Sequence, residues 1–367
     1  MQTELLILTG FMHNWTDTLS SLGARFHIDE ASQVDDFGRP LAAGELADGF
    51  VATVTDLGII AAEGPDAASF LHNQLTNDVE HLGRNEARLA GYCTPKGRLQ
   101  ATLLYWRSPG AEPDTVYLQL PRAIQPPLQK RLSMFVLRAK AKLRDATGEA
   151  PFAAVLGLGG AKAESALRRH VAELPAAPYG KVDGPFGTVI RLADVFGAPR
   201  YLWLTTAESA SSALPGLAGE LALGGNQAWQ LAAIHAGVPQ VTLATQEQFV
   251  PQMVNLELLG GVNFKKGCYP GQEIVARSQY LGKLKRRTAL ATVANLAARA
   301  GDEVFSMADP GQPCGMVVNA AANGLGGADL LVEMKLDALG EDVRHGAAGG
   351  PALAFQHMPY HLDALEL

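Results

Sequence analysis

Cysteine is scarce in this sequence. Only Cys93, Cys268 and Cys314 occur in 367 residues, and none belongs to a Cys-x-x-Cys pair. Their wide separation argues against a disulfide framework and against a self-contained zinc or cluster site. We therefore expect a reducing compartment and assign no metal site.

Long apolar runs are also missing. The run from Leu5 to Leu8 is far shorter than the ~20 apolar residues that a bilayer-spanning helix needs. The N-terminus carries Glu4 instead of a basic segment, and no small-residue cleavage site follows, so a signal peptide is disfavoured. We predict a cytoplasmic protein with no membrane partner. An amphipathic segment begins at Met12, so we interpret residues 1–11 as an upstream extension of the true reading frame.

Charge is sparse overall and uneven along the chain. Charged residues make up 18% of the sequence and the formal net charge is -7, which gives no general attraction to nucleic acid. Residues 265–287, in contrast, hold seven basic side chains and one acid, Glu273. This segment is a candidate for capturing a carboxylated or phosphorylated ligand. A solvated basic linker between domains is the alternative for residues 283–287.

A chain of this length and 47% hydrophobic residues is expected to form two or three globular domains. The first part predicts a strand, turn and helix unit, then a hairpin with its turn at residues 94–97, then a strand and a helix. The expected ranges are strands 49–55 and 57–62, a helix from 64, strands 88–92, 98–105 and 116–120, and a helix over 121–135.

A second mixed unit is expected from residue 153, and a β-rich tail follows residue 287. The second unit has a predicted glycine-rich turn at 157–160, a helix at 167–171, strands at 188–192 and 201–205, and helical residues to 223. Five short strands then indicate a small barrel or sandwich, at 290–293, 303–305, 314–318, 329–332 and 352–355. We predict an α+β protein with two mixed α/β units and a C-terminal β-barrel, divided as 1–150, 151–282 and 283–367.

The candidate reactive group is Cys268. It lies between two glycines, and residues 270–273 are typical of the first turn of a helix, with Pro270 at the first helical position. Two preceding lysines and the positive end of a helix dipole would favour the thiolate, which is the nucleophilic form. The alternative is a small buried cysteine that fills a tight turn. Cys93 and Cys314 fall in predicted strands and are expected to be inert core residues.

The residues around Cys268 also carry a family resemblance. Residues 264–273, with the sequence FKKGCYPGQE, resemble the signature of the YgfZ family of folate-binding proteins. Residues 252–262, Trp229 and residues 236–239 reinforce the match. Residues 70–79 and 96–98 resemble an opening unit that the family shares with the glycine-cleavage T-protein, so the similarity extends over nearly the whole chain.

The resemblance implies three domains in a ring around a central opening, with tetrahydrofolate or another reduced folate bound there. It assigns the folate-binding role to the N-terminal domain, and it implies a function in assembly or repair of iron-sulfur client enzymes such as tRNA methylthiotransferase. The family's cysteine falls on Cys268. The folate-binding residues that we expect from the motif and the basic segment are Lys265, Lys266, Gly267, Tyr269, Gly271, Gln272, Glu273 and Arg277.

Two departures separate the chain from T-proteins. T-proteins have an acidic pair after the Lys-Gly turn, which corresponds to Lys96 and Gly97 here. Residues 99–102 of this chain contain no carboxylate. Aminomethyl transfer to tetrahydrofolate is therefore the alternative function and not the preferred one. T-proteins also place a glutamate where this chain has His235, for which we favour a satisfied helix-face histidine. Direct tRNA binding through residues 283–287 is a third hypothesis, disfavoured by the net negative charge.

Overall fold

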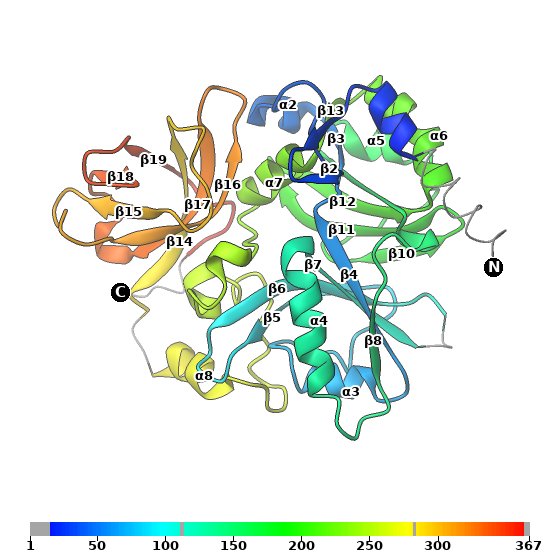
Figure 1. The fold of residues 1–367 in the computed structure, drawn as a ribbon, viewed down its shortest axis with the longest axis horizontal. Coiled ribbons are helices and arrows are strands. Elements are labelled where there is room, and N and C mark those ends of the chain that lie inside the picture. The colour runs from blue at the N-terminus through cyan, green and yellow to red at the C-terminus, as the bar shows by residue number, and fades with distance from the viewer. Residues whose placement is uncertain (1–14, 111–113, 282–283, 363–367) are drawn as a thin grey trace. The chain divides into compact units, whose positions relative to one another are not determined.

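The computed structural model describes residues 15–110, 114–281 and 284–362, so the interpretation of residues 1–11 lies outside these ranges. The chain forms two compact units, Met1–Leu57 with Ala146–Ala232 (unit 1), and Gly58–Asp145 with Ala233–Leu367 (unit 2). Each unit mixes helices and strands, and the predicted α+β class is confirmed (Figure 1). The three-domain boundaries and the ring stay predictions. In the described ranges, no helix has both the length and the apolar character to cross a membrane.

Unit 1 is built on a six-stranded sheet in the order β10-β11-β12-β9-β3-β13. Its strands pair antiparallel except for β13, which runs parallel to β3. Helical residues 15–21 and several short helices pack apolar side chains against the sheet, including the buried Trp15, Leu19 and Leu214. The elements are β1 Arg25–His27, β2 Glu30–Asp36, α2 Ala43–Asp48, β3 Phe50–Thr53, β9 Ala154–Gly159, α5 Ala163–Leu167, β10 Lys181–Gly184, β11 Gly187–Val195, β12 Ala198–Thr205, α6 Ala207–Ala218, β13 Ala222–Gly224 and α7 Asn226–His235, which continues into unit 2.

The glycine-rich segment at residues 157–160 is a correction to the sequence prediction. Gly157 and Gly159 lie inside β9 instead of in a turn. A Cβ atom at Gly157 would lie 2.2 Å from the Trp229 ring, and one at Gly159 would lie 2.6 Å from the Phe50 ring. These glycines are therefore sites where an aromatic ring lies directly on the strand backbone.

The end of the predicted helical stretch is a second correction. Helix α6 ends at Ala218, and β13 then pairs with β3. Residues 222–224 are alanine, leucine and glycine, which carry no strong strand signal by themselves. Their conformation comes from the open edge of β3, which supplies the hydrogen-bonding partners.

Unit 2 contains a five-stranded sheet in the order β5-β6-β7-β4-β8 and a six-stranded C-terminal sheet. The predicted hairpin is confirmed as β5 and β6, closed by the turn at residues 94–97, where Gly97 has φ +71°. The elements of this part are β4 Leu57–Glu63, α3 Ala67–His72, β5 Ala87–Cys93, β6 Leu99–Arg107, β7 Thr115–Pro121, η1 Arg122–Ile124, α4 Gln125–Met134, β8 Lys142–Asp145, η3 Leu243–Thr245, η4 Pro251–Val254 and α8 Gln272–Tyr280. The short helix η2 Ala150–Phe152 belongs to unit 1.

The C-terminal sheet is antiparallel, nearly closed and barrel-like, as predicted. Its order is β18-β15-β16-β17-β14-β19. The long pair β14 and β17 runs in register from Arg286 opposite Lys335 to Val293 opposite Ala328. The strands are β14 Arg286–Val293, β15 Glu303–Ser306, β16 Gly315–Ala322, β17 Ala328–Lys335, β18 Val343–His345 and β19 Leu353–Gln356, with η5 Leu336–Ala338. The short β18 was not predicted, because two of its three residues are charged or titratable.

Replacing Gly157 with alanine should destabilise the protein. The added methyl group would overlap the Trp229 ring, and overpacking a core costs about 1–3 kcal/mol. Urea unfolding of Gly157→Ala should therefore give a free energy of unfolding about 2 kcal/mol below wild type. The matched control is Gly216→Ala in α6, where no atom lies within 4 Å of the new Cβ. That control should be neutral or stabilising by up to about 1 kcal/mol, and equal stability of the two variants would contradict the packing described.

Candidate functional site

Cys268 lies on the loop of residues 264–271, which leads into α8 and is called the Cys268 loop below. All three cysteines are within the described ranges: Cys268 is exposed, whereas Cys93 and Cys314 are buried. Burial raises the pKa of the Cys93 thiol to about 12 and also raises that of Cys314. The expectation that Cys93 and Cys314 are core residues is confirmed, and the alternative of a buried Cys268 is wrong.

Helix α8 begins later than predicted. Its first residue is Gln272, and Gly271 is the N-cap with φ +82°. Pro270 therefore precedes the helix, and Cys268 lies three residues before the cap. The physical reason is the left-handed backbone of Gly271, which cannot continue into a helical turn.

Gly271 has this conformation where the loop meets the β5–β6 hairpin. A Cβ atom on Gly271 would lie 2.5 Å from the carbonyl oxygen of Thr94 and 2.7 Å from the Cα of Gly97. A Cβ atom on Gly97 would in turn lie 2.9 Å from the Cβ of Ile274. The Lys-Gly turn and the Cys268 loop, which are far apart in sequence, are therefore packed backbone to backbone.

Lys266 holds the other side of the loop. Its Nζ donates hydrogen bonds to the carbonyl oxygens of His72 at 2.6 Å, Leu75 at 3.1 Å and Gly267 at 3.2 Å. The ammonium also lies 4.7 Å from the centre of the buried Tyr269 ring. Burial lowers the pKa of Lys266 to about 8, although the charges of Asp78, Cys268 and Glu80 act in the opposite direction.

The segment before the loop is bound to residues 76 and 77. Thr76 Oγ1 donates to the carbonyl of Gly261 at 2.6 Å, and Asn77 Nδ2 donates to the carbonyl of Gly260 at 2.8 Å. The backbone N–H of Asn263 donates to the carbonyl of Thr76 at 2.9 Å. The two sequence segments at 70–79 and 252–262 thus join directly, and together they fix the start of the Cys268 loop.

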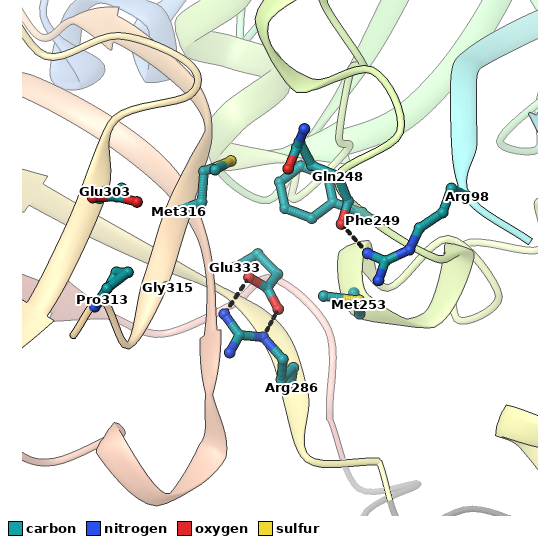
Figure 2. Close-up of a pocket in the computed structure, with 10 residues that line it drawn as sticks. All are labelled: Arg98, Gln248, Phe249, Met253, Arg286, Glu303, Pro313, Gly315, Met316 and Glu333. Carbon is teal, nitrogen blue, oxygen red and sulfur yellow. Dashed lines mark hydrogen bonds and ion pairs between the residues drawn. The ribbon is translucent and has the colours of Figure 1, made fainter. Parts of the chain in front are cut away.

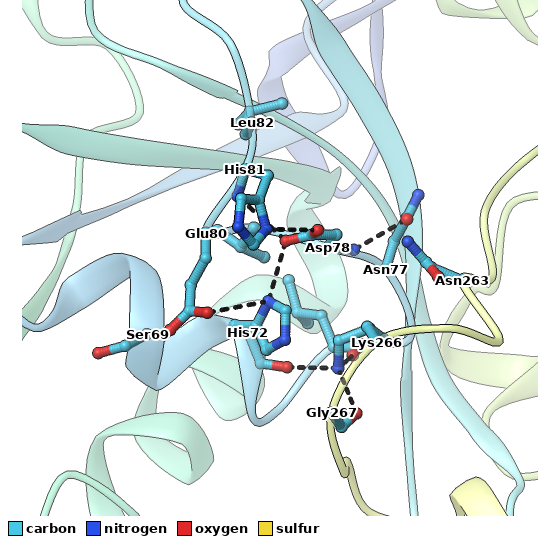
Figure 3. Close-up of polar contacts among 12 residues, drawn as sticks. Ser69, His72, Asn77, Asp78, Glu80, His81, Leu82, Asn263, Lys266 and Gly267 are labelled. Atoms are coloured by element: carbon cyan, nitrogen blue, oxygen red, sulfur yellow. Dashed lines mark hydrogen bonds and ion pairs between the residues drawn. The ribbon is translucent and has the colours of Figure 1, made fainter.

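A cluster of titratable side chains surrounds the end of α3 (Figure 3). His72 Nδ1 lies 3.0 Å from Asp78 Oδ1, and His81 Nδ1 lies 2.9 Å from Asp78 Oδ2. Burial alone would raise the pKa of Asp78, but hydrogen bonds from His81 hold it below its ordinary value. Glu80 Oε2 is 4.0 Å from His72 Nδ1. Sequence reasoning missed this cluster, because residues 72–81 show no catalytic spacing and the cluster depends on the turn after α3.

The basic segment is less exposed than its sequence indicates. Arg287 is 1% exposed and forms an ion pair with the buried Glu257, and it also donates to the carbonyl of Gln252 at 2.9 Å. Arg286 forms a two-point ion pair with Glu333. Lys265, Arg277 and Lys285 are exposed, and Lys283 lies outside the described residues. Strand β14 therefore uses two of the seven cations for internal ion pairs.

A pocket of about 370 Å³ lies within unit 2, and both Arg98, just after the hairpin turn, and Arg286 line it (Figure 2). Arg98 is exposed and donates through Nη1 to the carbonyl of Gln248. Met316 adds apolar surface beside the charged groups, whereas Phe249 is only 1% exposed. The lining residues are Arg98, Gln248, Phe249, Met253, Arg286, Glu303, Pro313, Gly315, Met316 and Glu333.

The positions that distinguish this chain from T-proteins have structural partners. His235 Nε2 lies 2.6 Å from Asp329 Oδ2 and both side chains are buried, which confirms a satisfied helix-face histidine. Gln100 Nε2 donates to Glu247 Oε1 at 2.8 Å, and Thr102 Oγ1 donates to the carbonyl of Pro239 at 3.1 Å. The strand after the Lys-Gly turn therefore holds the loop at residues 239–247.

Comparison with known proteins places the chain in a family. No family model matches it. It is 31% identical to the tRNA-modifying protein YgfZ of Klebsiella pneumoniae, over 85% of this chain and 93% of that protein. The chain belongs to the YgfZ family. The YgfZ of Cronobacter sakazakii is 34% identical over 67% of this chain and 70% of its own length, and that of Yersinia pestis is 29% identical over 92% and 98%.

A protein outside the YgfZ family shares the fold of this chain. It is similar to the crystal structure of the glycine cleavage system aminomethyltransferase T from Bartonella henselae, with a TM-score of 0.72 and 17% identity over 95% of this chain and 96% of that one. At that identity the similarity concerns the fold. Within the described residues, no group of three or more His, Cys, Asp or Glu side chains is arranged to hold a metal ion.

Lys266 should give the stability of the protein a specific pH dependence. Its pKa is about 8 when folded and 10.5 ordinarily, so over this window the unfolded chain binds more protons than the folded chain. Stability therefore rises with pH between about 8 and 10.5 through this group. The difference in unfolding free energy between wild type and Lys266→Met should increase with pH across the window. Lys265→Met, at an exposed neighbour, is the control and should run parallel to wild type; a pH-independent Lys266→Met difference would refute the assignment.

Proposed function

We propose that this YgfZ-family protein acts in the cytoplasm, binds a reduced folate and supports the assembly or repair of iron-sulfur enzymes that modify tRNA, with Cys268 as its reacting thiol. The observation that carries the proposal is the exposure of Cys268 on a loop whose neighbours are immobilised. The names of the curated relatives supply the tRNA-modification context.

The clamping of the loop supports a chemical role for the thiol. Ordering a backbone costs roughly 1–2 kcal/mol per residue, and burying an ammonium is a further cost. Three carbonyl acceptors at Lys266 and close backbone packing at Gly271 offset these costs. The result is a fixed position for an exposed cysteine, which a simple connecting loop does not require.

A single exposed cysteine suits transient handling of sulfur or of a cluster. A thiolate is both a nucleophile and a soft metal ligand. Iron-sulfur clusters are generally held by four ligands, so Cys268 would supply one ligand and the client enzyme the others. In this proposal the cluster is the cargo and the chain does not retain it.

Our proposal assigns part of the folate to the pocket in unit 2. Folates end in glutamate carboxylates, and a guanidinium is a strong partner for a carboxylate. Arg98 lines the pocket, and the partly exposed Met316 supplies apolar surface for an aromatic ring. Arg98 would hold the glutamate tail, and the exposed Lys265 and Arg277 are further candidates from the predicted set. The predicted roles of Lys266, Gly267, Tyr269, Gly271, Gln272 and Glu273 in folate binding stay part of the proposal.

The two other hypotheses receive less support. Aminomethyl transfer of the T-protein type needs carboxylates after the Lys-Gly turn, where this chain has Gln100 and Thr102 bound to a loop. Direct tRNA binding relied on residues 283–287, in which Arg286 and Arg287 form ion pairs with acids. We therefore expect any effect on tRNA to arise through the modifying enzyme.

The thiol can be tested by complementation. In a bacterial strain that lacks its own family member, wild type should restore tRNA methylthiolation, measured by mass spectrometry of tRNA nucleosides. Cys268→Ala should fail because the reacting sulfur is gone. Cys314→Ala removes a buried thiol and is the matched control, which should rescue. Rescue by Cys268→Ala would remove the cysteine from the proposal, and failure of folded wild type would reject the pathway.

Folate binding can be tested separately by calorimetry with tetrahydrofolate that carries one or several glutamates. Arg98→Gln should weaken binding about tenfold, the effect of losing roughly 1.4 kcal/mol of a charged hydrogen bond. The loss should be larger for the longer tail. Arg299→Gln, at a largely exposed arginine of the barrel unit, is the control and should bind as wild type. Absence of wild-type binding, or an unchanged affinity of Arg98→Gln, would contradict the assignment.

A further inference from the structure

His72 is the last residue of α3, and its ring is oriented by a carboxylate. The residue is 7% exposed, and Nδ1 lies 3.0 Å from Asp78 Oδ1. Asp78 also accepts hydrogen bonds from the backbone N–H of His81 at 3.1 Å and from its ring at 2.9 Å. These bonds hold the pKa of Asp78 below its ordinary value, at which an aspartate is already charged at neutral pH. A charged carboxylate accepts the Nδ1 proton, so neutral His72 carries its free lone pair on Nε2.

The Nε2 atom of His72 faces the loop that carries Cys268. A Cβ atom on Gly267 would lie 3.7 Å from Nε2, and within the described part of the chain Nε2 has no hydrogen-bond partner. Cys268 is the next residue, and consecutive Cα atoms are about 3.8 Å apart. Because Gly267 is a glycine, it has no side chain to cover Nε2.

The loop and the imidazole are also joined through the backbone. Lys266 Nζ donates to the carbonyl oxygen of His72 itself at 2.6 Å, so the residue two positions before Cys268 holds the end of α3 (Figure 3). The position of the ring relative to the loop is thus set from both sides: by Asp78 at Nδ1 and by Lys266 at the backbone. This is the order of base and orienting carboxylate used to activate cysteine nucleophiles.

We propose that His72 Nε2 accepts the proton of the Cys268 thiol, directly or through one water, when the thiol reacts. The S–H bond breaks and an N–H bond forms, which gives a thiolate and an imidazolium. When the sulfur leaves again, the proton returns to it. Asp78 is a positioning residue that holds the ring and stabilises its positive charge. This role rests on the proposed function only in taking Cys268 as the reacting group.

The charges around His72 are compatible with this transfer. Asp78 and Glu80 approach Nδ1 at 3.0 Å and 4.0 Å, and His81 contacts the ring only through Asp78. The Lys266 ammonium is bound to the His72 carbonyl and not to the ring. An imidazolium would therefore form beside two carboxylates, and the ammonium near Cys268 would remain on the side of the thiolate.

The test is the rate of Cys268 alkylation by iodoacetamide as a function of pH, measured on the Cys268 peptide by mass spectrometry. Only the thiolate reacts. His72→Gln should lower the rate near neutral pH by at least about tenfold and move the midpoint of the profile to higher pH. The rates should converge with wild type above the ordinary thiol pKa of about 8.5. Asp78→Asn should show a smaller shift in the same direction.

The matched control is His81→Gln, which removes the other imidazole on Asp78. The backbone N–H of residue 81 still donates to Asp78, and an aspartate is charged at neutral pH at its ordinary pKa, so this variant should keep the wild-type profile. The His81 ring is 79% exposed, so the substitution leaves the packing intact. A His72→Gln or Asp78→Asn profile that superposes on wild type in a folded protein would overturn the proposal. The assay contains neither folate nor client enzyme, so its outcome is independent of the complementation result.

Discussion

The Cys268 loop depends on one buried ammonium. Lys266 Nζ can donate three hydrogen bonds, and it donates them to carbonyls of His72, Leu75 and Gly267. Burial still lowers its pKa, so the acceptors offset the desolvation cost only in part. Loss of any one of these carbonyl contacts would leave an N–H group of the Lys266 ammonium without a partner. The loop, the end of α3 and the following turn are therefore coupled through a single side chain.

Close packing and buried charge also account for two glycines and one arginine of unit 2. Gly97 and Gly271 allow two backbones to approach to a distance at which a Cβ atom on Gly271 would be 2.5 Å from a carbonyl oxygen. Arg287 and Glu257 are both almost fully buried, and each makes the burial of the other tolerable. The glycines hold the Cys268 loop against the hairpin, and Arg287 holds β14 against residues 252–257. Of the basic residues near Cys268 in sequence, some form internal ion pairs with acids and others are exposed.

Elements whose signal is local were predicted well. The β5–β6 hairpin has proline early and glycine late in its turn, and the strands of the barrel are separated by turn residues. Elements whose conformation depends on packing against distant residues were not predicted well. Gly157 and Gly159 were placed in a turn because glycine clusters usually mark turns, whereas the Trp229 and Phe50 rings require them in a strand. The predicted start of α8 at Pro270 is wrong because Gly271 adopts a left-handed backbone where it packs against Gly97.

Residue types were enough to predict the α+β class, the core positions of Cys93 and Cys314 and the family resemblance of the motif around Cys268. These follow from residue types and short-range periodicity, which are present in the linear chain. Three features appear only in the folded chain: Arg286 and Arg287 are paired with acids, Cys268 is exposed, and His72 faces Gly267. Each of these depends on contacts between segments far apart in sequence, and no local pattern specifies which distant side chain will arrive.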